Sequence, residues 1–254
     1  ESAVGEVAAA KIAQVAQAVP GAPVLGVATG SSPLGVYRAL AELVAAGRLQ
    51  LGEAHVFALD EYVGLPPGHP ESYAEVIRRT VTEPLGLNPA RVHVPNGFAD
   101  DLSTAGAAYE DAISAAGGVD VQLLGVGANG HVGFNEPTSS LGSRTRVKTL
   151  ARKTREDNAR FFDSLDQVPM HCVTQGLGTI MDARHVVLVA QGAGKAEAIA
   201  AIVEGPVTAL WPGSVLQFHP RATIVIDEPA ASRLKLADYY RETDAAKPDW
   251  QRFA

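Results

Sequence analysis

The segment GVGANGHVGFNEP, residues 125–137, contains the side chains best suited to proton transfer. It places His131 and Glu136 in a glycine-rich turn after VDVQLLGV, residues 119–126, an apolar run typical of a buried parallel strand. A histidine is an effective acid or base near neutral pH, and Asn129 and Glu136 lie close enough in sequence to orient its ring. Because open α/β sheets bind ligands at the carboxyl ends of strands, His131 is a candidate catalytic residue.

The glycines of this segment also match a dinucleotide-binding pattern. Gly125, Gly127 and Gly130 spell G-x-G-x-x-G. That motif requires a helix to begin in the turn and an acidic residue about 20 positions later. Here HVGFNEP follows instead of a helix, and the later segment is basic. We therefore interpret the glycines as a sharp turn that lets the backbone approach a small ligand.

A second candidate site lies in VATGSSPLGVY, where Thr29, Gly30, Ser31 and Ser32 lead from a strand into a helix. We expect Pro33 at the first helical position and Ser32 as the cap. Free amide groups and the helix dipole favour a phosphate at such a helix start. The Walker A spacing is absent, which argues against a nucleoside triphosphate. An ordinary capped helix is the alternative interpretation.

Two adjacent carboxylates follow the next strand, in ALDEYVGLPPGHPESY. Side chains alternate along a strand, so only one of the two can face the crevice. We expect Asp60 to face it as a general base and Glu61 to face structure or solvent. Taken alone, the pair is also compatible with two solvated loop acids.

Basic residues are concentrated in one short segment. Seven of the 21 lysines and arginines lie between residues 144 and 160, and we expect most of them on a solvated helical face. In an acidic chain such a cluster also suits a small phosphorylated ligand, because arginine offers bidentate contacts to phosphate. Lys195, at the start of a later helix, is a further candidate cation. The seven residues are Arg144, Arg146, Lys148, Arg152, Lys153, Arg155 and Arg160.

Alternating strand-like and helix-like segments must position these side chains. The alternation predicts parallel strands with crossover helices, and hence an α/β, Rossmann-like three-layer sandwich with a mainly parallel central sheet. The amino terminus opens almost directly into a helix, which leaves open whether an edge strand precedes it. Strands are expected at 24–28, 55–59, 119–126, 185–190 and 222–227, and helices at 4–18, 33–47 and about 195–204.

Composition indicates a globular chain that needs no disulfide or metal for stability. The 254 residues are 46% hydrophobic and 19% charged, with a single cysteine, Cys172. We expect one domain over residues 1–254, without cofactor or metal, in the cytoplasm, because there is no signal-like start and no apolar run of transmembrane length. The net charge of −7 argues against nucleic-acid binding.

Taken together, the motifs resemble those of the glucosamine-6-phosphate deaminase family, in the sugar-phosphate isomerase and gluconolactonase superfamily. The resemblance runs nearly end to end. It implies conversion of glucosamine 6-phosphate and water to fructose 6-phosphate and ammonia, without metal or organic cofactor. The matching pieces are TGSSPLGVY, LDEYVGL with HPESY, GVGANGHVGFNEP, SSLGSRTRVKTL, NARFFD, and EGPVTALWPGSVLQFHP followed by DEP.

The resemblance also implies roles for individual residues. His131 would open the pyranose ring, with Glu136 and Asn129 orienting the imidazole, and Asp60 would move the proton from C2 to C1. The substrate phosphate would lie on Thr29, Gly30, Ser31 and Ser32. Arg160 and Lys195 match positions that complete the phosphate site in the family. The segment around 146–175 resembles the family's mobile lid.

Two features bear on activity and regulation. The family pattern that we compare has aspartate where this chain has Asn129, which predicts a lower histidine pKa here than in an aspartate-bearing relative. Ser139, Arg146 and Lys148 match positions that bind N-acetylglucosamine 6-phosphate as activator in hexameric members. Members without this regulation also exist, and a surface patch that orders the lid is an equal alternative. Oligomeric state depends on the same question.

Three other functions are compatible with the fold. A 6-phosphogluconolactonase would share the phosphate loop but would not need a base at C2, so LDEYVGL together with GHVGFNEP argues against it. A galactosamine-6-phosphate deaminase differs only in substrate epimer. A sugar-phosphate sensor without catalytic activity would not require His131, Glu136 and Asp60 together.

Overall fold

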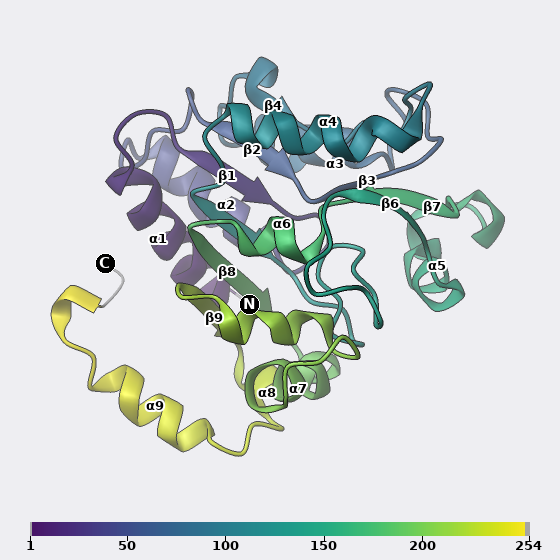
Figure 1. The fold of residues 1–254 in the computed structure, drawn as a ribbon. Coiled ribbons are helices and arrows are strands. Elements are labelled where there is room, and N and C mark those ends of the chain that lie inside the picture. Colours follow the sequence, from purple (N-terminus) through teal and green to yellow (C-terminus); the bar gives the residue numbers. More distant parts are fainter. Residues whose placement is uncertain (1, 252–254) are drawn as a thin grey trace.

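The sheet at the centre of the molecule has six strands in the order β4-β2-β1-β5-β8-β9 (Figure 1). In this computed structural model, which describes residues 2–251, all of its pairings are parallel. The expected mainly parallel central sheet is therefore confirmed. Its strands are β1 (Val24–Val27), β2 (His55–Ala58), β4 (Val92–His93), β5 (Val121–Leu124), β8 (His185–Ala190) and β9 (Ala222–Ile226).

Helices cover both faces of this sheet, because its strands carry apolar side chains on both sides (Figure 1). Along β8, Val187 and Val189 join a core with α1 and α2, whereas Val186 and Leu188 join a second core with α4, α6 and α7. This alternation is expected of a strand buried on both faces, and it produces three layers. The helices are α1 (Ser2–Ala18), α2 (Leu34–Ala45), α4 (Leu102–Ala115), α6 (Leu177–Met181) and α7 (Ala196–Glu204).

A second, antiparallel sheet of three strands lies beside the central one, in the order β3-β7-β6. In its register Thr174 is paired with Asp60 on one side and with Arg146 on the other. Side chains of directly paired residues point to the same face of a sheet. Asp60, Thr174 and Arg146 therefore share one face. The strands are β3 (Asp60–Tyr62), β6 (Arg146–Thr149) and β7 (His171–Thr174).

Shorter elements connect and flank these layers. A π-helical turn at Arg78–Thr82 continues from α3, and the last α-helix, α9, lies away from the layered body (Figure 1). No helix among residues 2–251 is long and apolar enough to cross a membrane. The remaining helices are α3 (Tyr73–Ile77), α5 (Arg152–Asn158), α8 (Glu228–Ala231) and α9 (Ala237–Ala245).

The elements predicted from periodicity are present, most of them with shorter ends. The five predicted strands correspond to β1, β2, β5, β8 and β9, and the three predicted helices to α1, α2 and α7. The second sheet was not predicted. The expected domain, 1–254, includes residues 1 and 252–254, which lie outside the described residues.

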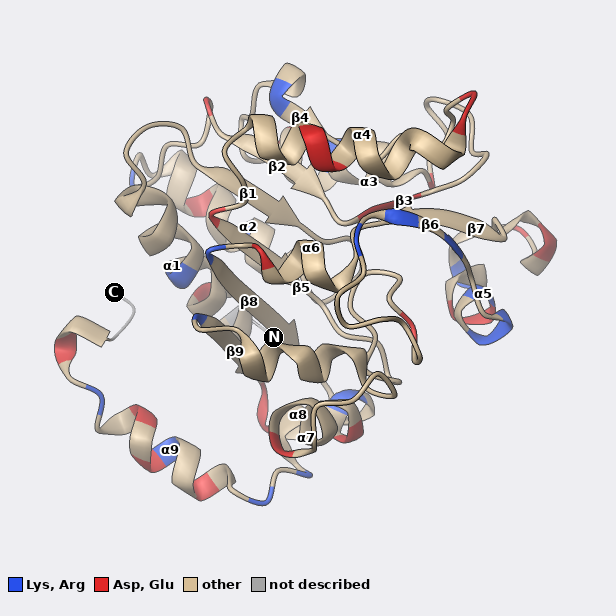
Figure 2. Ribbon diagram, viewed as in Figure 1, with Lys and Arg blue, Asp and Glu red and all other residues tan. Residues whose placement is uncertain are grey.

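The expectation of a single helical face for the basic cluster was wrong. Residues 146–149 form β6, and Arg152, Lys153 and Arg155 lie on α5 (Figure 2). Within β6 the side chains alternate between half-buried and exposed, which is the period of a strand. On α5, Arg152 and Lys153 pair with acids four residues later, as neighbours on a helix surface do.

Candidate active site

The candidate site lies where the strand order of the central sheet reverses. From β1 the chain proceeds to β2 on one side and later returns to β5 on the other. The connections that follow two such strands go to opposite faces of the sheet, and ligands bind between them at the carboxyl ends of the strands. The two loops are close here, since a Cβ on Gly125 after β5 would lie 3.9 Å from Cδ of Pro33 after β1. The candidate phosphate loop and the histidine loop therefore meet at the switch point.

The loop after β1, Thr29–Ser32, presents free backbone donors beside the start of α2. Gly30 has φ +98°, a conformation that only glycine adopts without strain. Within residues 2–251, the N–H groups of Gly30, Ser31 and Ser32 have no hydrogen-bond acceptor. These donors and the helix dipole favour an anion. The Thr29 side chain acts to lower the pKa of the Tyr73 hydroxyl, which places this loop beside α3.

The expected cap of α2 was wrong by one residue. Pro33 is the N-cap, and its carbonyl accepts from the N–H groups of Val36 and Tyr37. No side chain caps this helix start. The Ser32 hydroxyl therefore makes no capping hydrogen bond to α2 and is available for another partner.

His131 lies in the loop after β5, with its ring packed over Gly127. A Cβ on Gly127 would lie within 2.1–2.5 Å of the ring atoms Cε1, Nδ1 and Nε2, so only glycine fits there. Nδ1 of His131 is 2.6 Å from Oδ1 of Asn129. An amide oxygen accepts, so this contact assigns the proton to Nδ1 and leaves Nε2 as the free base.

Burial lowers the pKa of His131, and the charge of Lys195 lowers it further. The nearby Glu136 and Asp157 carboxylates act in the opposite direction. The net direction favours a neutral imidazole at physiological pH.

Glu136 affects this histidine by charge, while its hydrogen bonds go elsewhere. Its Oε2 accepts from the backbone N–H of Ala151 at 3.1 Å, and its Oε1 accepts from the Thr154 hydroxyl. These contacts hold the first turn of α5. The structure thus brings Asn129 to the imidazole and places the contacts of Glu136 at the predicted lid.

Asp60 and Glu61 point to opposite faces of β3, as strand alternation predicts. Glu61 accepts from the backbone N–H groups of Tyr62, Tyr73 and Ala74, and so holds the start of α3. Asp60 is only 5% exposed. Burial, with a smaller contribution from the charge of Glu61, raises the pKa of Asp60 to about 8.

The histidine loop covers Asp60 directly. A Cβ on Gly133 would lie 3.4 Å from Oδ2 of Asp60 and 3.0 Å from Oγ1 of Thr174. The N–H of Phe134 donates to Oγ1 of Thr174 at 3.1 Å. The loop that bears His131 therefore rests on the strand row that bears Asp60, so the two candidate groups for proton transfer are carried by adjoining segments.

Two cations lie within range of the site. Lys195 is the N-cap residue of α7, at the end of the loop after β8, and burial lowers its pKa, with a smaller contribution from Arg160. The charge of Lys195 in turn lowers the pKa of His131. Lys195 therefore lies near both Arg160 and His131. Arg160 is exposed, and its guanidinium carbon lies 4.7 Å from the ring centre of Phe161.

The three residues predicted for regulation do not share a partner. Lys148 Nζ is 3.4 Å from Oγ of the buried Ser139, whereas Arg146 donates to Oδ1 of Asn135 at 2.8 Å. Lys148 and Ser139 form one contact pair. Arg146 instead contacts the loop between His131 and Glu136.

Several residues at the site were missed by sequence reasoning. Tyr62 receives a hydrogen bond from Asn158 of α5 at 3.0 Å, and its hydroxyl lies 3.4 Å from that of Tyr73. Thr174 and Asn135 hold the histidine loop. The tyrosines of LDEYVGL and HPESY were visible in the matched motifs, but only the fold brings them together.

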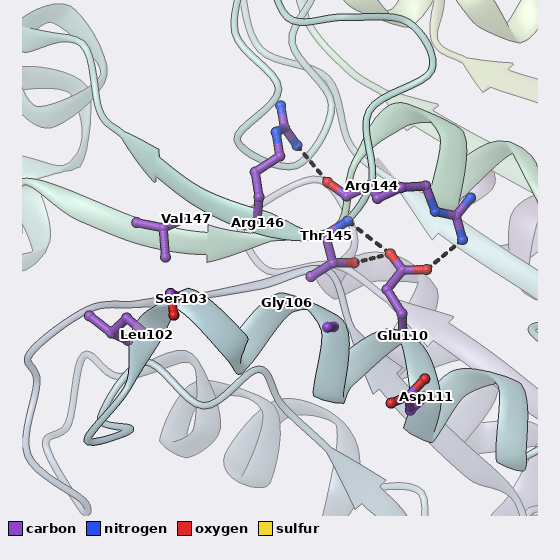
Figure 3. Close-up of a pocket in the computed structure, with 10 residues that line it drawn as sticks. Leu102, Ser103, Gly106, Glu110, Asp111, Arg144, Thr145, Arg146 and Val147 are labelled. Carbon is purple, nitrogen blue, oxygen red and sulfur yellow. Dashed lines mark hydrogen bonds and ion pairs between the residues drawn. The ribbon is translucent and has the colours of Figure 1, made fainter.

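A cleft of about 530 Å³ lies away from this site, between α4 and β6 (Figure 3). The Glu110 carboxylate in this cleft is already paired, since it accepts from Thr145, Thr179 and Arg144. Figure 3 shows the Arg146 side chain directed away from this cleft. Among residues 2–251 no group of three or more histidine, cysteine, aspartate or glutamate side chains is arranged to hold a metal ion.

Sequence comparison finds relatives over nearly the full length. A family model described as glucosamine-6-phosphate isomerases/6-phosphogluconolactonase matches residues 1–225. The chain is 62% identical over 249 residues to a glucosamine-6-phosphate deaminase of Cutibacterium acnes, covering 98% of this chain and 95% of the relative. It is 59% identical over 260 residues to one of Bifidobacterium longum strain DJO10A, covering 99% and 96%.

Solved structures agree. A monomeric glucosamine-6-phosphate deaminase superposes with a TM-score of 0.88 at 39% identity, covering 91% of this chain and 96% of that one. A 6-phosphogluconolactonase from Trypanosoma cruzi superposes with a TM-score of 0.71 at 21% identity, covering 92% and 94%, a likeness that concerns the fold alone.

Proposed function

Because this chain belongs to the family of glucosamine-6-phosphate isomerases and 6-phosphogluconolactonases, we propose that it is a glucosamine-6-phosphate deaminase. It converts glucosamine 6-phosphate and water to fructose 6-phosphate and ammonia. One arrangement supports the proposal: the loop that carries His131 lies over Asp60, and the segment after β5 that leads into it lies beside the helix start after Thr29–Ser32. The ordinary metabolic setting is amino-sugar catabolism in the cytoplasm, downstream of N-acetylglucosamine.

The substrate phosphate binds to the N–H groups of the loop Thr29–Ser32 at the start of α2. Lys195 and Arg160 supply positive charge from the opposite side of the crevice. Burial of Lys195 supports this assignment, because a partly desolvated cation gains from an anionic partner. No cofactor enters the reaction.

His131 opens the sugar ring. The neutral imidazole accepts the proton of the hydroxyl at C1 and delivers a proton to the ring oxygen, which gives the open aldose. Asn129 keeps the ring in the required tautomer. The lowered pKa of His131 supports a base that starts neutral.

Asp60 carries out the isomerisation. As a carboxylate it takes the proton from C2 and returns it at C1, while the ammonium group at C2 gives up one proton and the oxygen at C1 gains one, so that C1 becomes a CH₂OH group and C2 an imine carbon. Water adds at C2 and ammonia leaves, which yields the ketose. The raised pKa of Asp60 supports this role, because a base with a pKa near the working pH is the most effective.

The segment at about 146–175 closes as a lid over the reacting sugar. Its helix α5 is attached to the site through Glu136 at its first turn and through Asn158 to Tyr62 at its end. Closure would exclude bulk water from the intermediates before the imine is formed.

The rival functions make different demands. A 6-phosphogluconolactonase requires no base at C2, and a sensor requires no proton transfer, so loss of activity in Asp60→Asn separates both from the deaminase. The choice between gluco and galacto epimers is tested by assaying both substrates. Regulation through Ser139, Arg146 and Lys148, together with homo-oligomer formation, is tested by adding N-acetylglucosamine 6-phosphate. Hyperbolic substrate kinetics that this ligand leaves unchanged would rule out the regulatory hypothesis.

The primary experiment incubates purified protein with glucosamine 6-phosphate, without metal or nucleotide. Ammonia and ketose phosphate should appear in equal amounts, and Asp60→Asn should form neither. Ketose phosphate without ammonia, or no product with folded protein, would overturn the assignment.

A further inference from the structure

Arg146 has a contact that binding of an anion does not explain. Its Nη1 donates to Oδ1 of Asn135 at 2.8 Å and lies 3.3 Å from the carbonyl oxygen of Arg144. Asn135 is fully buried and lies in the loop between His131 and Glu136. Its Nδ2 donates to the carbonyls of Val132 at 3.0 Å and Gln175 at 2.8 Å. Both amide protons and the amide oxygen of Asn135 are thus used.

The position of Arg146 in the second sheet shows which part of the molecule this contact holds in place. Asp60, Thr174 and Arg146 are paired across the three strands β3, β7 and β6. The loop lies along this row: Gly133 is over Asp60, the N–H of Phe134 donates to Thr174, and Asn135 accepts from Arg146. Three successive loop residues therefore lie along three adjacent strands, and the last two are hydrogen-bonded to them.

From this arrangement we infer that Arg146 is a positioning residue for the reaction, acting through Asn135 to hold the histidine loop over Asp60. Only Arg146 of the basic residues on β6 reaches this loop, since Lys148 contacts Ser139. The inference depends on the proposed function for its kinetic readout but not for its structural one. It holds without any activator.

Loss of the Arg146 contact should loosen the loop at the reacting centre and leave the phosphate contacts intact. Asn135 would lose the only donor to its oxygen among residues 2–251, and a buried unpaired acceptor favours local rearrangement. Water would then reach Asp60, whose pKa is raised mainly by burial. The chemical step should suffer more than substrate binding.

The test compares Arg146→Gln with Arg144→Gln, without N-acetylglucosamine 6-phosphate. Arg144 is a matched control because its side chain pairs with Glu110 and Asp182 on the outer face. In Arg146→Gln, kcat should fall about tenfold with KM changed less than about twofold, and the acidic limb of the pH profile should move to lower pH. Arg144→Gln should keep the kcat and pH profile of the unmodified protein.

A double-mutant cycle tests the path through Asn135. Arg146→Gln and Asn135→Ser should be non-additive in kcat, because each removes the same contact. Additive effects would overturn the inference. So would a rise in KM with unchanged kcat, which would make Arg146 a ligand-binding residue.

Hydrogen exchange separates failure of this inference from failure of the proposed function. Without substrate, the amides of Phe134 and Asn135 should exchange faster in Arg146→Gln than in Arg144→Gln. Unchanged protection there would overturn the positioning role whatever the reaction. If the unmodified protein releases no ammonia while these amides lose protection in Arg146→Gln, the proposed function fails and the structural role stands.

Discussion

The N–H of Phe134 donates to the hydroxyl oxygen of Thr174 at 3.1 Å, and this hydrogen bond joins the loop of His131 to the strand next to Asp60. Both residues are buried. The contact is therefore shielded from water, and no solvent molecule can readily replace it.

Thr174→Val should weaken both stability and catalysis. It leaves the buried N–H of Phe134 without an acceptor, at a cost of about 1–3 kcal/mol in the free energy of unfolding. Urea unfolding measures this loss, and the deaminase assay should show a reduced kcat. Thr174→Ser keeps the oxygen and is the control. Equal stability of the valine and serine variants would contradict the proposed importance of the hydrogen bond.

Asp60→Asn should abolish activity and stabilise the fold in a pH-dependent manner. The folded-state pKa of about 8 lies above the ordinary value of 3.8, so between these values the folded protein binds more protons than the unfolded chain. Stability is therefore lost as pH rises through this window. The asparagine variant lacks this penalty, and its advantage should grow to a few kcal/mol at most on going from about pH 4.5 to about pH 8.5.

Thermal or urea unfolding at both pH values checks the sign. Glu61→Gln, one residue away on the opposite face of β3, provides the comparison, because Glu61 accepts three backbone hydrogen bonds and its loss should destabilise the fold. An advantage of Asp60→Asn that does not change with pH would show that the carboxyl is not buried as described.

Asn129→Asp should raise the pKa of His131. The amide oxygen is 2.6 Å from Nδ1, and a carboxylate in its place would stabilise the imidazolium. NMR titration of the His131 ring measures the pKa directly, and it should be higher in the aspartate variant. Activity should survive, with the limb that depends on His131 displaced upward in the pH–rate profile. Superimposable titrations of the two proteins would refute the orienting role of Asn129.

Gly127→Ala should displace the imidazole. The added methyl would lie within 2.1–2.5 Å of ring atoms, so the ring must move. Misplacement of a catalytic group by about 1 Å can reduce the rate about a hundredfold, and kcat should fall accordingly. Gly142→Ala is the control, since its Cβ would meet nothing within 4 Å. Comparable activity of the two alanine variants would remove His131 from the reaction.

Sequence periodicity was sufficient to predict the parallel sheet but not the antiparallel one. β8 reads HVVLVA, and β5, VQLL, lies within the mainly apolar run 119–126, as expected of strands covered on both faces. β3 has three residues and β6 reads RVKT, so neither provides enough apolar pattern to separate a strand from a polar helix or loop. The tertiary pairing with β7 determines both.

Candidate site residues could be proposed from the sequence where they follow a recognisable strand. His131, Asp60 and Thr29–Ser32 each follow a strand of the central sheet, and the rule on carboxyl ends identifies them. Asn135 and Thr174 could not be identified, because their function comes from contacts across 40 residues of sequence. Ser32 was assigned as a cap because residue type favours it, but the helix begins one residue later at Leu34.

The candidate site is built from the loops that follow β1, β5 and β8. These three strands are adjacent in the sheet, although long segments of the chain separate them. If the proposed phosphate site is right, a partly folded chain in which β8 has not yet joined β5 would lack Lys195 and should retain a sugar phosphate less tightly. Affinity for an inorganic or sugar phosphate thus reports on completion of the sheet, and a refolding protein should regain ligand binding last, after its helices have formed.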